Sequence, residues 1–272
     1  MPAKDYHAAD GCSKSVLFKL EGKTDMAFEQ FLKDGTKETE AMRFGTMIHT
    51  AVLEPEHFES RYALAPDLNK NTKEYKAFKE SLGEKLPIDA DDKLRIDAMV
   101  KNIKAHVLAS AILAGKHEKS FFWIDKETDL LCRCRPDSIH LNAGIIADLK
   151  SADDISPDEW IKKAYDLGYH VQAAFYLDGV KAAIEQSGNT LGLQNVPDKF
   201  VFVAAESKAP YQVANYDFPD FFIDEGRKTY KRLLWRYKNY VANKIKGNKP
   251  TTYPSSIITI QPKVYMFKKE TN

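Results

Sequence analysis

The chain has 272 residues, of which 43% are hydrophobic, enough to bury one large core or two smaller ones. Its 40 basic and 39 acidic residues give a formal net charge of +1, so total charge neither favours nor excludes a nucleic-acid ligand. Three cysteines, Cys12, Cys132 and Cys134, form no CxxC pair, which indicates a reducing compartment without a disulfide framework. The sequence contains no run near the roughly 20 apolar residues of a membrane span, and its first residues lack the apolar core of a signal peptide. We therefore expect a cytoplasmic protein with no membrane partner.

Helices dominate the expected N-terminal third of the chain. Short helices are expected at about Ser13–Leu20 and Met26–Lys33, and the apolar spacing over Glu40–Leu53 predicts an amphipathic helix. Residues 66–87 are polar and rich in lysine and asparagine, so we expect a loop with at most one short helix. A long helix should then run from about Ala90 to Ala114. Its expected apolar side consists of Leu94, Ile96, Met99, Val100, Ile103 and Val107.

Strands are expected from about residue 120 onward. Ser120–Ile124 and Leu130–Arg135 flank a polar turn and predict a hairpin. Ile145–Lys150 is a short apolar run that is typical of a buried strand. Two further strands are expected at Lys199–Ala205 and Gln212–Tyr216.

Three helices are expected among and after these strands. The first follows a capping box at Ser156–Glu159, with proline at the first helical position, and reaches about Tyr165. The second runs from about Tyr169 to Gln186, and the third from Asp220 to about Lys246. This order of elements predicts an α/β or α+β core behind a helical N-terminal third.

Charged residues interrupt the apolar run at Ile145–Lys150. Because side chains two apart on a strand point to the same face, Asp148 and Lys150 should project together, with Leu149 in the core. If Asp137, which follows the preceding strand, lies on a neighbouring strand, two carboxylates converge as Mg²⁺ requires. The lysine could orient a metal-bound water or stabilise charge on a phosphate. The set suits metal-assisted phosphodiester hydrolysis, although a surface strand with an Asp–Lys pair explains the same pattern.

Other candidate residues lie elsewhere in the chain. Gln172 and Tyr176 are four apart on a predicted helix and so share one face. His49 lies away from the apolar stripe of its helix, and Glu118 immediately precedes the hairpin. A satisfied helix histidine, a buried Gln–Tyr hydrogen bond and a solvated glutamate are the corresponding structural alternatives.

Four segments, "MRFGTMIHTAVLEPE", "RCRPD", "IIADLKSADD" and "YHVQAAFYLDG", resemble those of the RecE-type (exonuclease VIII) double-strand exonucleases, a RecB-like branch of the PD-(D/E)xK nucleases. The resemblance extends from about Tyr6 to about Lys246. It implies a restriction-endonuclease-like core, in which a central mixed sheet is flanked by helices, and one nuclease domain over residues 1–272. Within that domain we expect a mainly helical part at 1–115, a catalytic core at 116–218, and a helix and tail at 219–272.

The resemblance also implies the roles of individual residues. Asp137 and Asp148 match the metal-binding carboxylates, Lys150 the catalytic lysine, His49 a histidine of the metal shell, Gln172 and Tyr176 the motif behind the active site, and Glu118 the acidic residue before the hairpin. We expect Asp137, Asp148, His49 and the carbonyl of Leu149 to hold one or two Mg²⁺ ions, for which Mn²⁺ can substitute. Three cysteines cannot supply the four ligands of an iron–sulfur cluster, so none is expected.

The activity implied is degradation of linear double-stranded DNA from its ends, 5′ to 3′, leaving 3′ single-stranded tails for recombination and repair. Such enzymes of phage or prophage form homo-oligomeric rings, here a trimer or tetramer, and cooperate with a single-strand annealing protein. Arg43, Arg133 and Arg135 adjoin the motifs and are candidate phosphate contacts, although exposed arginines are often only solvated. The lysines of Lys228–Lys249 are expected to form a solvated helix face. An endonuclease with the same chemistry and an inactive DNA-binding module are the alternatives.

Overall fold

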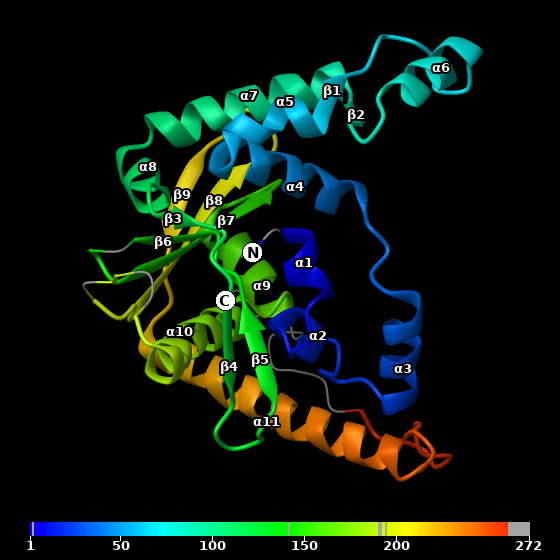
Figure 1. The fold of residues 1–272 in the computed structure, drawn as a ribbon, viewed down its shortest axis with the longest axis vertical. Helices are drawn as coiled ribbons and strands as arrows, with labels where there is room; N and C mark the ends of the chain where they lie inside the picture. Colours follow the sequence, from blue (N-terminus) through cyan, green and yellow to red (C-terminus); the bar gives the residue numbers. More distant parts are fainter. Residues whose placement is uncertain (2, 141, 190–191, 194, 261–272) are drawn as a thin grey trace, which may run out of the picture.

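A computed structural model describes residues 1, 3–140, 142–189, 192–193 and 195–260. The fold is built on a mixed five-stranded sheet with the order β3-β6-β7-β8-β9 (Figure 1). These strands are Lys116–His117, Ser138–His140, Ile145–Ala152, Lys199–Glu206 and Val213–Tyr216. Only β7 and β8 pair in parallel, and the other neighbours are antiparallel. The predicted strands at 145–150, 199–205 and 212–216 are confirmed, and β7 continues two residues further than predicted.

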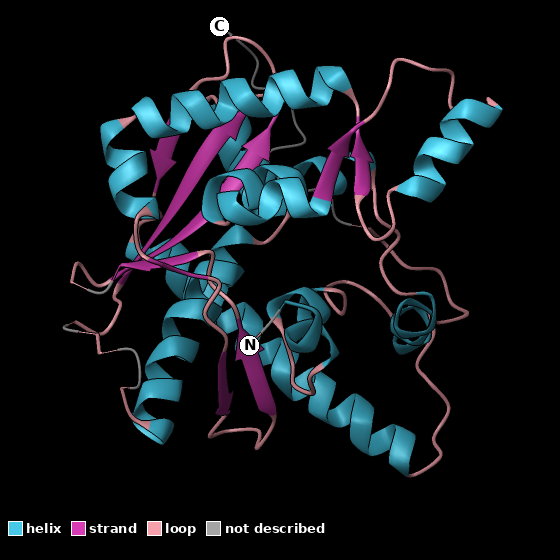
Figure 2. Ribbon diagram, turned by 45° about the horizontal axis from the view of Figure 1, so that its top comes forward, coloured by secondary structure: helices cyan, strands magenta, loops and turns pink. Residues whose placement is uncertain are grey.

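Helices cover both faces of this sheet (Figures 1 and 2). One face carries α4 (Glu40–Leu53), α7 (Ala90–Ala105) and α8 (Val107–Leu113), and the other carries α9 (Pro157–Asp166) and α10 (Tyr169–Ser187), with α11 (Asp220–Ile245) packed outside α10. Because successive side chains of a strand point to opposite faces, Ala147 and Leu149 pack on the α4 side, whereas Ile146 packs on the α10 side. The even-numbered residues Asp148 and Lys150 therefore face α9 and α10.

The N-terminal segment and the hairpin lie beside α10. The short helices α1 (Ala3–Ala8), α2 (Lys14–Phe18) and α3 (Asp25–Asp34) precede α4. Strands β4 (Phe121–Ile124) and β5 (Leu131–Cys134) pair as the predicted hairpin, but they form a sheet of their own. The ring of Trp123 packs 5.0 Å from that of Phe175 on α10. The backbone of Cys12 forms an isolated parallel β-bridge with that of Cys132, and both thiols are free. The hairpin is thus fixed to both the N-terminal segment and α10.

The predicted helix from Ala90 to Ala114 is wrong in one respect, because it breaks at His106. This residue is extended, with φ −79° and ψ 103°, and its Nδ1 accepts a hydrogen bond from the Ala109 backbone N–H at 3.2 Å. The side chain therefore caps a new helix, α8, whose axis differs from that of α7. Two residues of the predicted apolar side are exposed, Leu94 at 68% within α7 and Val107 at 85% directly after the break.

Several short elements have no signal in the sequence. Strands β1 (Tyr62–Leu64) and β2 (Leu86–Ile88) form a two-stranded parallel pair, and η1 (Pro55–His57) and α5 (Phe58–Arg61) extend the chain beyond α4. Three-residue strands are too short for a periodicity to emerge. The one helix allowed within residues 66–87 is α6 (Lys73–Ser81).

The capping box at the start of α9 is not formed. Ser156 occupies the N-cap position, but its side chain makes no capping hydrogen bond. Pro157 nevertheless stands at the first helical position, where its fixed φ suits a helix and its missing N–H costs nothing. The helix boundary was therefore predicted correctly although one of its two signals is absent.

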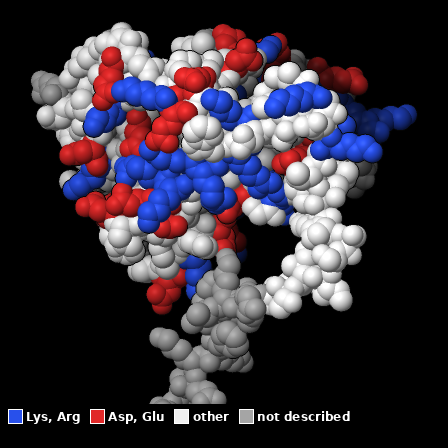
Figure 3. Space-filling model, turned by 90° about the horizontal axis from the view of Figure 1, so that it is seen from below, with Lys and Arg blue, Asp and Glu red and all other residues white. Residues whose placement is uncertain are grey.

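A basic surface lies on the side of the molecule where α11 runs, as Figure 3 shows. Several basic side chains of α11 have carboxylate partners: Lys228 pairs with Glu225 at 3.4 Å, Arg232 with Glu21 at 2.6 Å, and Lys231 with Glu127. Exposed pairs of this kind contribute little to stability. They agree with a solvated helix face. Within the described residues, none of the helices has the length and apolar character needed to cross a membrane.

The packing of α11 on α10 depends on Gly226. A Cβ atom at this position would lie 2.2 Å from the backbone oxygen of His170, so alanine would force two helix backbones apart. Gly226→Ala is therefore expected to lower the free energy of unfolding by about 3 kcal/mol. Urea denaturation monitored by circular dichroism measures the change.

Gly45→Ala on α4 is the matched control. Both glycines are helical, but a Cβ at Gly45 would meet only the Ser151 hydroxyl, at 3.8 Å. Alanine has the higher helix propensity, so this variant should be neutral or up to about 1 kcal/mol more stable. Equal loss of stability in the two variants would contradict the packing argument.

Candidate active site

The two carboxylates meet where the pairing of β6 with β7 ends. The last paired residues are Ser138 and Ala147. Asp137, just before β6, and Asp148, within β7, are the next residues beyond that pair. The Leu149 backbone N–H donates a hydrogen bond to Asp137 Oδ2 at 2.7 Å. Both carboxylates are buried, with exposures of 8% for Asp137 and 2% for Asp148. The strand next to β7 on this side is β6, and not β5, the second strand of the hairpin. The prediction that Asp137 reaches Asp148 from the end of the hairpin strand is therefore wrong.

Asp148 is held by residues of α10 and of its own strand. The Gln172 side-chain amide donates a hydrogen bond to Oδ1, so the alternative of a buried Gln–Tyr pair does not describe this residue. The Lys150 ammonium forms an ion pair with Oδ2, so both oxygens of this buried carboxylate have a partner. Burial alone would lower the pKa of Lys150, yet the charges of Asp148 and Asp137 raise it above its usual range. The lysine is therefore a fixed positive charge.

His49 reaches the carboxylates from α4. Its Nε2 lies 2.7 Å from the Leu149 carbonyl oxygen, to which only a protonated Nε2 can donate, and its Nδ1 lies 3.4 Å from Asp137 Oδ2. Burial and the charge of Lys150 lower the pKa of His49, which favours the neutral ring. Nδ1 then presents a lone pair to a carboxylate oxygen. Since His49 Nδ1 and Asp137 Oδ2 are then both acceptors, a proton or a cation must lie between them.

Glu118 completes a group of possible metal ligands. One ligand atom from each of His49, Glu118 and Asp137 lies within 4.8 Å of the others. Glu118 has a φ of +54°, uncommon for a residue other than glycine, and its N–H donates to the Asp137 carbonyl at 3.2 Å. This group differs from the expected ligand set, because it contains Glu118 in place of Asp148. The carbonyl of Leu149, also expected as a ligand, already accepts the His49 hydrogen bond.

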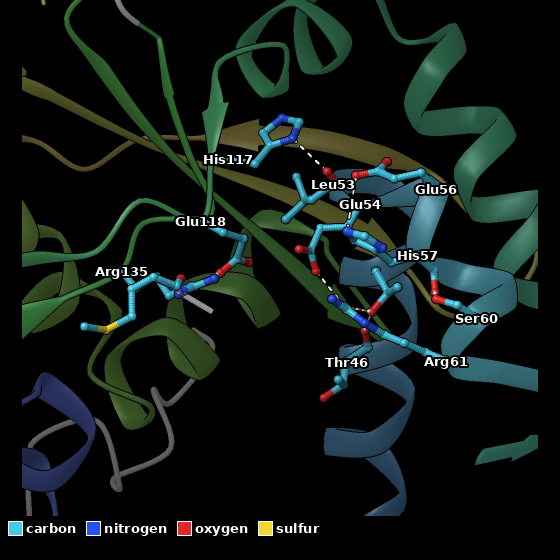
Figure 4. Close-up of polar contacts among 12 residues, drawn as sticks. Thr46, Leu53, Glu54, Glu56, His57, Ser60, Arg61, His117, Glu118 and Arg135 are labelled. Atoms are coloured by element: carbon cyan, nitrogen blue, oxygen red, sulfur yellow. Dashed lines mark hydrogen bonds and ion pairs between the residues drawn. The ribbon is translucent and has the colours of Figure 1, made fainter. Parts of the chain in front are cut away.

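Contacts at the end of α4 fix the helix that carries His49 (Figure 4). The ring of His117 lies 2.7 Å from the Leu53 carbonyl oxygen through Nδ1, and 2.6 Å from that of Leu113 through Nε2. Arg61 pairs with Glu54 at 2.6 Å. These contacts tie α4 to α8, α5 and β3, so His49 approaches the sheet on a rigid element.

Two of the three arginines expected to contact DNA are buried and bound to other groups of the protein. Arg135 pairs with Glu118 at 2.5 Å, as Figure 4 shows, and its side chain is 9% exposed. Arg133 is 8% exposed, donates to the carbonyls of Gly11 and His7, and stacks over a tyrosine ring. A phosphate would have to displace these contacts. The geometry therefore does not support Arg133 or Arg135 as DNA contacts and instead gives them structural roles.

Arg43, the third arginine, lines a cavity of about 730 Å³ beside the end of β7. Ser151, the residue after Lys150 on β7, and Lys163 of α9 also line it, but none of His49, Glu118, Asp137, Asp148 and Lys150 does. Carboxylates of α4 and α7 line it as well, so the surface is mixed in charge. A contact of Arg43 with a substrate phosphate stays a prediction.

Two further residues complete the surroundings. Tyr176 lies one helical turn after Gln172, and its ring packs 6.0 Å from that of Phe200. Burial, and after it the electrostatic effect of the Cys134 thiol, raises the pKa of Tyr176 well above the usual range. Lys14 of α2 was missed by sequence reasoning. The charge of Lys150 lowers the pKa of Lys14 and that of Asp148 raises it, although Lys14 is more than 130 residues away from both in the chain. A lone lysine at the start of a five-residue helix carries no signal that could have identified it.

A family model described as "PDDEXK-like domain of unknown function" (DUF3799) matches residues 5–251. The chain belongs to this family. A crystal structure from Eubacterium rectale, described as a "Putative exonuclease", has a similar fold, with a TM-score of 0.65 over 98% of this chain and 97% of that chain at 13% identity. The crystal structure of SSO0001 covers 68% of this chain and 84% of its own at 14% identity, but its TM-score of 0.29 supports no argument. No protein of curated function matches.

Membership of the PDDEXK-like family confirms the predicted core. The mixed sheet flanked by helices is the PD-(D/E)xK, restriction-endonuclease-like fold. That Asp137 is the aspartate of the Pro-Asp pair, and Asp148 and Lys150 the acid and lysine of the D-x-K triplet, stays a prediction from the sequence. The match establishes the PD-(D/E)xK superfamily rather than its RecE-type branch.

Proposed function

We propose that this protein is a metal-dependent exonuclease that degrades linear double-stranded DNA 5′ to 3′ and leaves 3′ single-stranded tails. The observation that supports this most directly is the convergence of Asp137, Asp148 and Lys150 with His49 and Glu118 at one end of β7. The PDDEXK-like family and the fold shared with the Eubacterium rectale protein agree with nuclease chemistry. The proposed 5′ to 3′ direction of degradation is taken from the resemblance of the sequence to the RecE-type exonucleases.

The residues present fit a hard divalent cation such as Mg²⁺ or Mn²⁺. Neighbouring ligands of an octahedral Mg²⁺ at about 2.0–2.1 Å lie roughly 3 Å apart, close to the 3.4 Å between His49 Nδ1 and Asp137 Oδ2. Asp148 supplies a second buried carboxylate, whose Oδ2 pairs with the Lys150 ammonium. His49, Glu118, Asp137 and Asp148 would hold the metal, which would supply Lewis-acid stabilisation of the phosphate and a more acidic water.

Each side chain then has a distinct task. Gln172 orients Asp148 through its amide, and the Leu149 N–H orients Asp137. The Lys150 ammonium, fixed by two carboxylates, stabilises negative charge that develops on the phosphate. His49 donates to the Leu149 carbonyl, which keeps its Nδ1 lone pair directed at the site.

Digestion of linear and covalently closed circular duplex DNA, with Mg²⁺ and with a chelator, tests the proposal. Progressive loss of linear DNA only, and only with metal, is expected, and the position of an end label gives the polarity. Cleavage of the circle would favour the endonuclease. Binding without cleavage of either substrate would favour the inactive DNA-binding module.

We infer a homo-oligomeric ring of three or four copies that encircles duplex DNA in the cytoplasm, because a nearly neutral protein needs its positive charge concentrated to remain on a polyanion. The product tails would serve a single-strand annealing protein in recombination. A light-scattering mass equal to one chain would contradict the ring.

Metal affinity is expected to fall as the pH falls. Burial and the charge of Asp148 raise the pKa of Asp137 well above its usual range, so metal must displace a proton there. Each displaced proton weakens apparent affinity by up to about tenfold per pH unit below that pKa. Titration calorimetry in two buffers with different ionisation enthalpies measures the protons released. An affinity that does not change with pH would contradict this view of Asp137.

A further inference from the structure

The turn between α9 and α10 brings α2 to the candidate active site. Gly168 in this turn has a φ of +65°, and a Cβ there would lie 2.6 Å from the Phe18 ring, so α2 packs directly on the turn. One helical turn before Phe18, the Lys14 ammonium donates a hydrogen bond to the Leu167 carbonyl at 2.6 Å. The position of Lys14 is therefore set by backbone contact and close packing.

Lys150 reaches the same turn from the sheet. Its Nζ lies 5.2 Å from the centroid of the Tyr169 ring, while Nζ of Lys14 lies 4.6 Å from the centroid of the Phe18 ring. Two ammonium groups thus contact residues on either side of Gly168: Lys14 of α2 contacts the Leu167 carbonyl, and Lys150 of β7 contacts the Tyr169 ring. The positive charge of Lys150 lowers the pKa of Lys14.

The two lysines differ in how their charge is compensated. Lys150 pairs with Asp148, whereas the contacts of Lys14 are with a carbonyl oxygen and an aromatic ring, both neutral. Within the part of the chain that the structure describes, no carboxylate forms an ion pair with Lys14. Burial, and after it the charge of Lys150, lowers the pKa of Lys14 to about 7. A half-buried cation beside a second cation favours an anion from outside the protein.

We propose that Lys14 is a further residue of this site and binds a phosphate oxygen of the substrate strand beside Lys150. The inference rests on the proposed nuclease function. A phosphodiester carries one negative charge on two oxygens, and ammonium groups bind such oxygens through charge-assisted hydrogen bonds. Lys14 would neutralise and position the phosphate, while the carboxylate site opposite would activate it.

Equilibrium binding of a labelled linear duplex, measured in chelator over a range of salt concentrations, tests this role without requiring cleavage. Lys14→Met keeps an unbranched side chain on the Phe18 ring but removes the charge. We expect roughly tenfold weaker binding and a log–log salt slope smaller by about 0.9, the value for one phosphate contact. Lys14→Arg should restore both quantities, and Lys19→Met, an exposed lysine that ends the same helix, should change neither.

Thermal unfolding of each variant shows whether the fold is intact, and Lys14→Gln replaces Lys14→Met if the latter unfolds. An unchanged affinity and salt slope in the neutral variant would overturn the proposal and leave Lys14 a structural residue. The two proposals fail separately. A wild-type protein that binds DNA but never cleaves it refutes the nuclease function, whereas a cleaving enzyme that is indifferent to Lys14 refutes only this inference.

Discussion

Asp148→Asn is expected to lower the rate of DNA cleavage by about 10³-fold or more. A metal supplies several kcal/mol of transition-state stabilisation, and each 1.36 kcal/mol is a factor of ten in rate. Asparagine keeps an oxygen for the Gln172 amide but removes the charge that pairs with Lys150. Single-turnover digestion of linear duplex at saturating enzyme measures the chemical step separately from binding.

Asp154→Asn is the matched control for this variant. Asp154 is fully exposed in the segment that follows β7, and asparagine can still accept the hydrogen bond from the Ser156 N–H. Its cleavage rate should equal that of the wild type. A similar rate in the two variants, with both folded, would remove Asp148 from the catalytic machinery.

Asp137→Asn should have opposite effects on activity and stability. Cleavage should fall by about 10³-fold, since a charged metal ligand is lost. The metal-free protein should gain about 1 kcal/mol at neutral pH, a Tm increase of roughly 2–4 °C. Burial and the Asp148 charge raise the folded-state pKa of Asp137 above its unfolded value. This carboxyl group therefore favours folding while protonated, and the contribution is lost as the pH rises through the raised pKa.

Thermal unfolding in chelator from about pH 5 to about pH 8 measures this difference. The Tm advantage of Asp137→Asn should shrink toward low pH, where the wild-type carboxyl group is protonated. The asparagine oxygen can still accept the Leu149 N–H, so the hydrogen bond is not the variable. A variant less stable than the wild type at every pH would show that the carboxylate pair costs nothing in the folded protein.

Periodicity was sufficient to predict the larger elements of the fold. The helix at Glu40–Leu53 and the sheet strands have apolar patterns long enough to specify their type. The break at His106 could not be predicted, because a histidine interrupts no pattern and its capping bond depends on local geometry. The separation of the hairpin from the central sheet also has no sequence signal, since pairing partners are chosen by tertiary packing.

The site was predictable only where its chemistry is local. Asp148 and Lys150 share a strand, so their common face follows from the period of two. The position of Glu118 beside Asp137 depends on a left-handed backbone and on the antiparallel pairing of β3 with β6, and a two-residue strand such as β3 gives no sequence signal. Arg133 and Arg135 adjoin the motifs in sequence, but adjacency does not reveal which arginines are used by the fold itself.

The ligand group His49, Glu118 and Asp137 is drawn from three segments separated by 69 and 19 residues of chain. An unfolded chain does not hold such residues together, so a cation bound there would bind almost entirely to the native state. By mass action, a metal concentration 100 times the dissociation constant would add about 2.7 kcal/mol to the stability of the fold. Availability of the metal would then govern the lifetime of the protein as well as its activity.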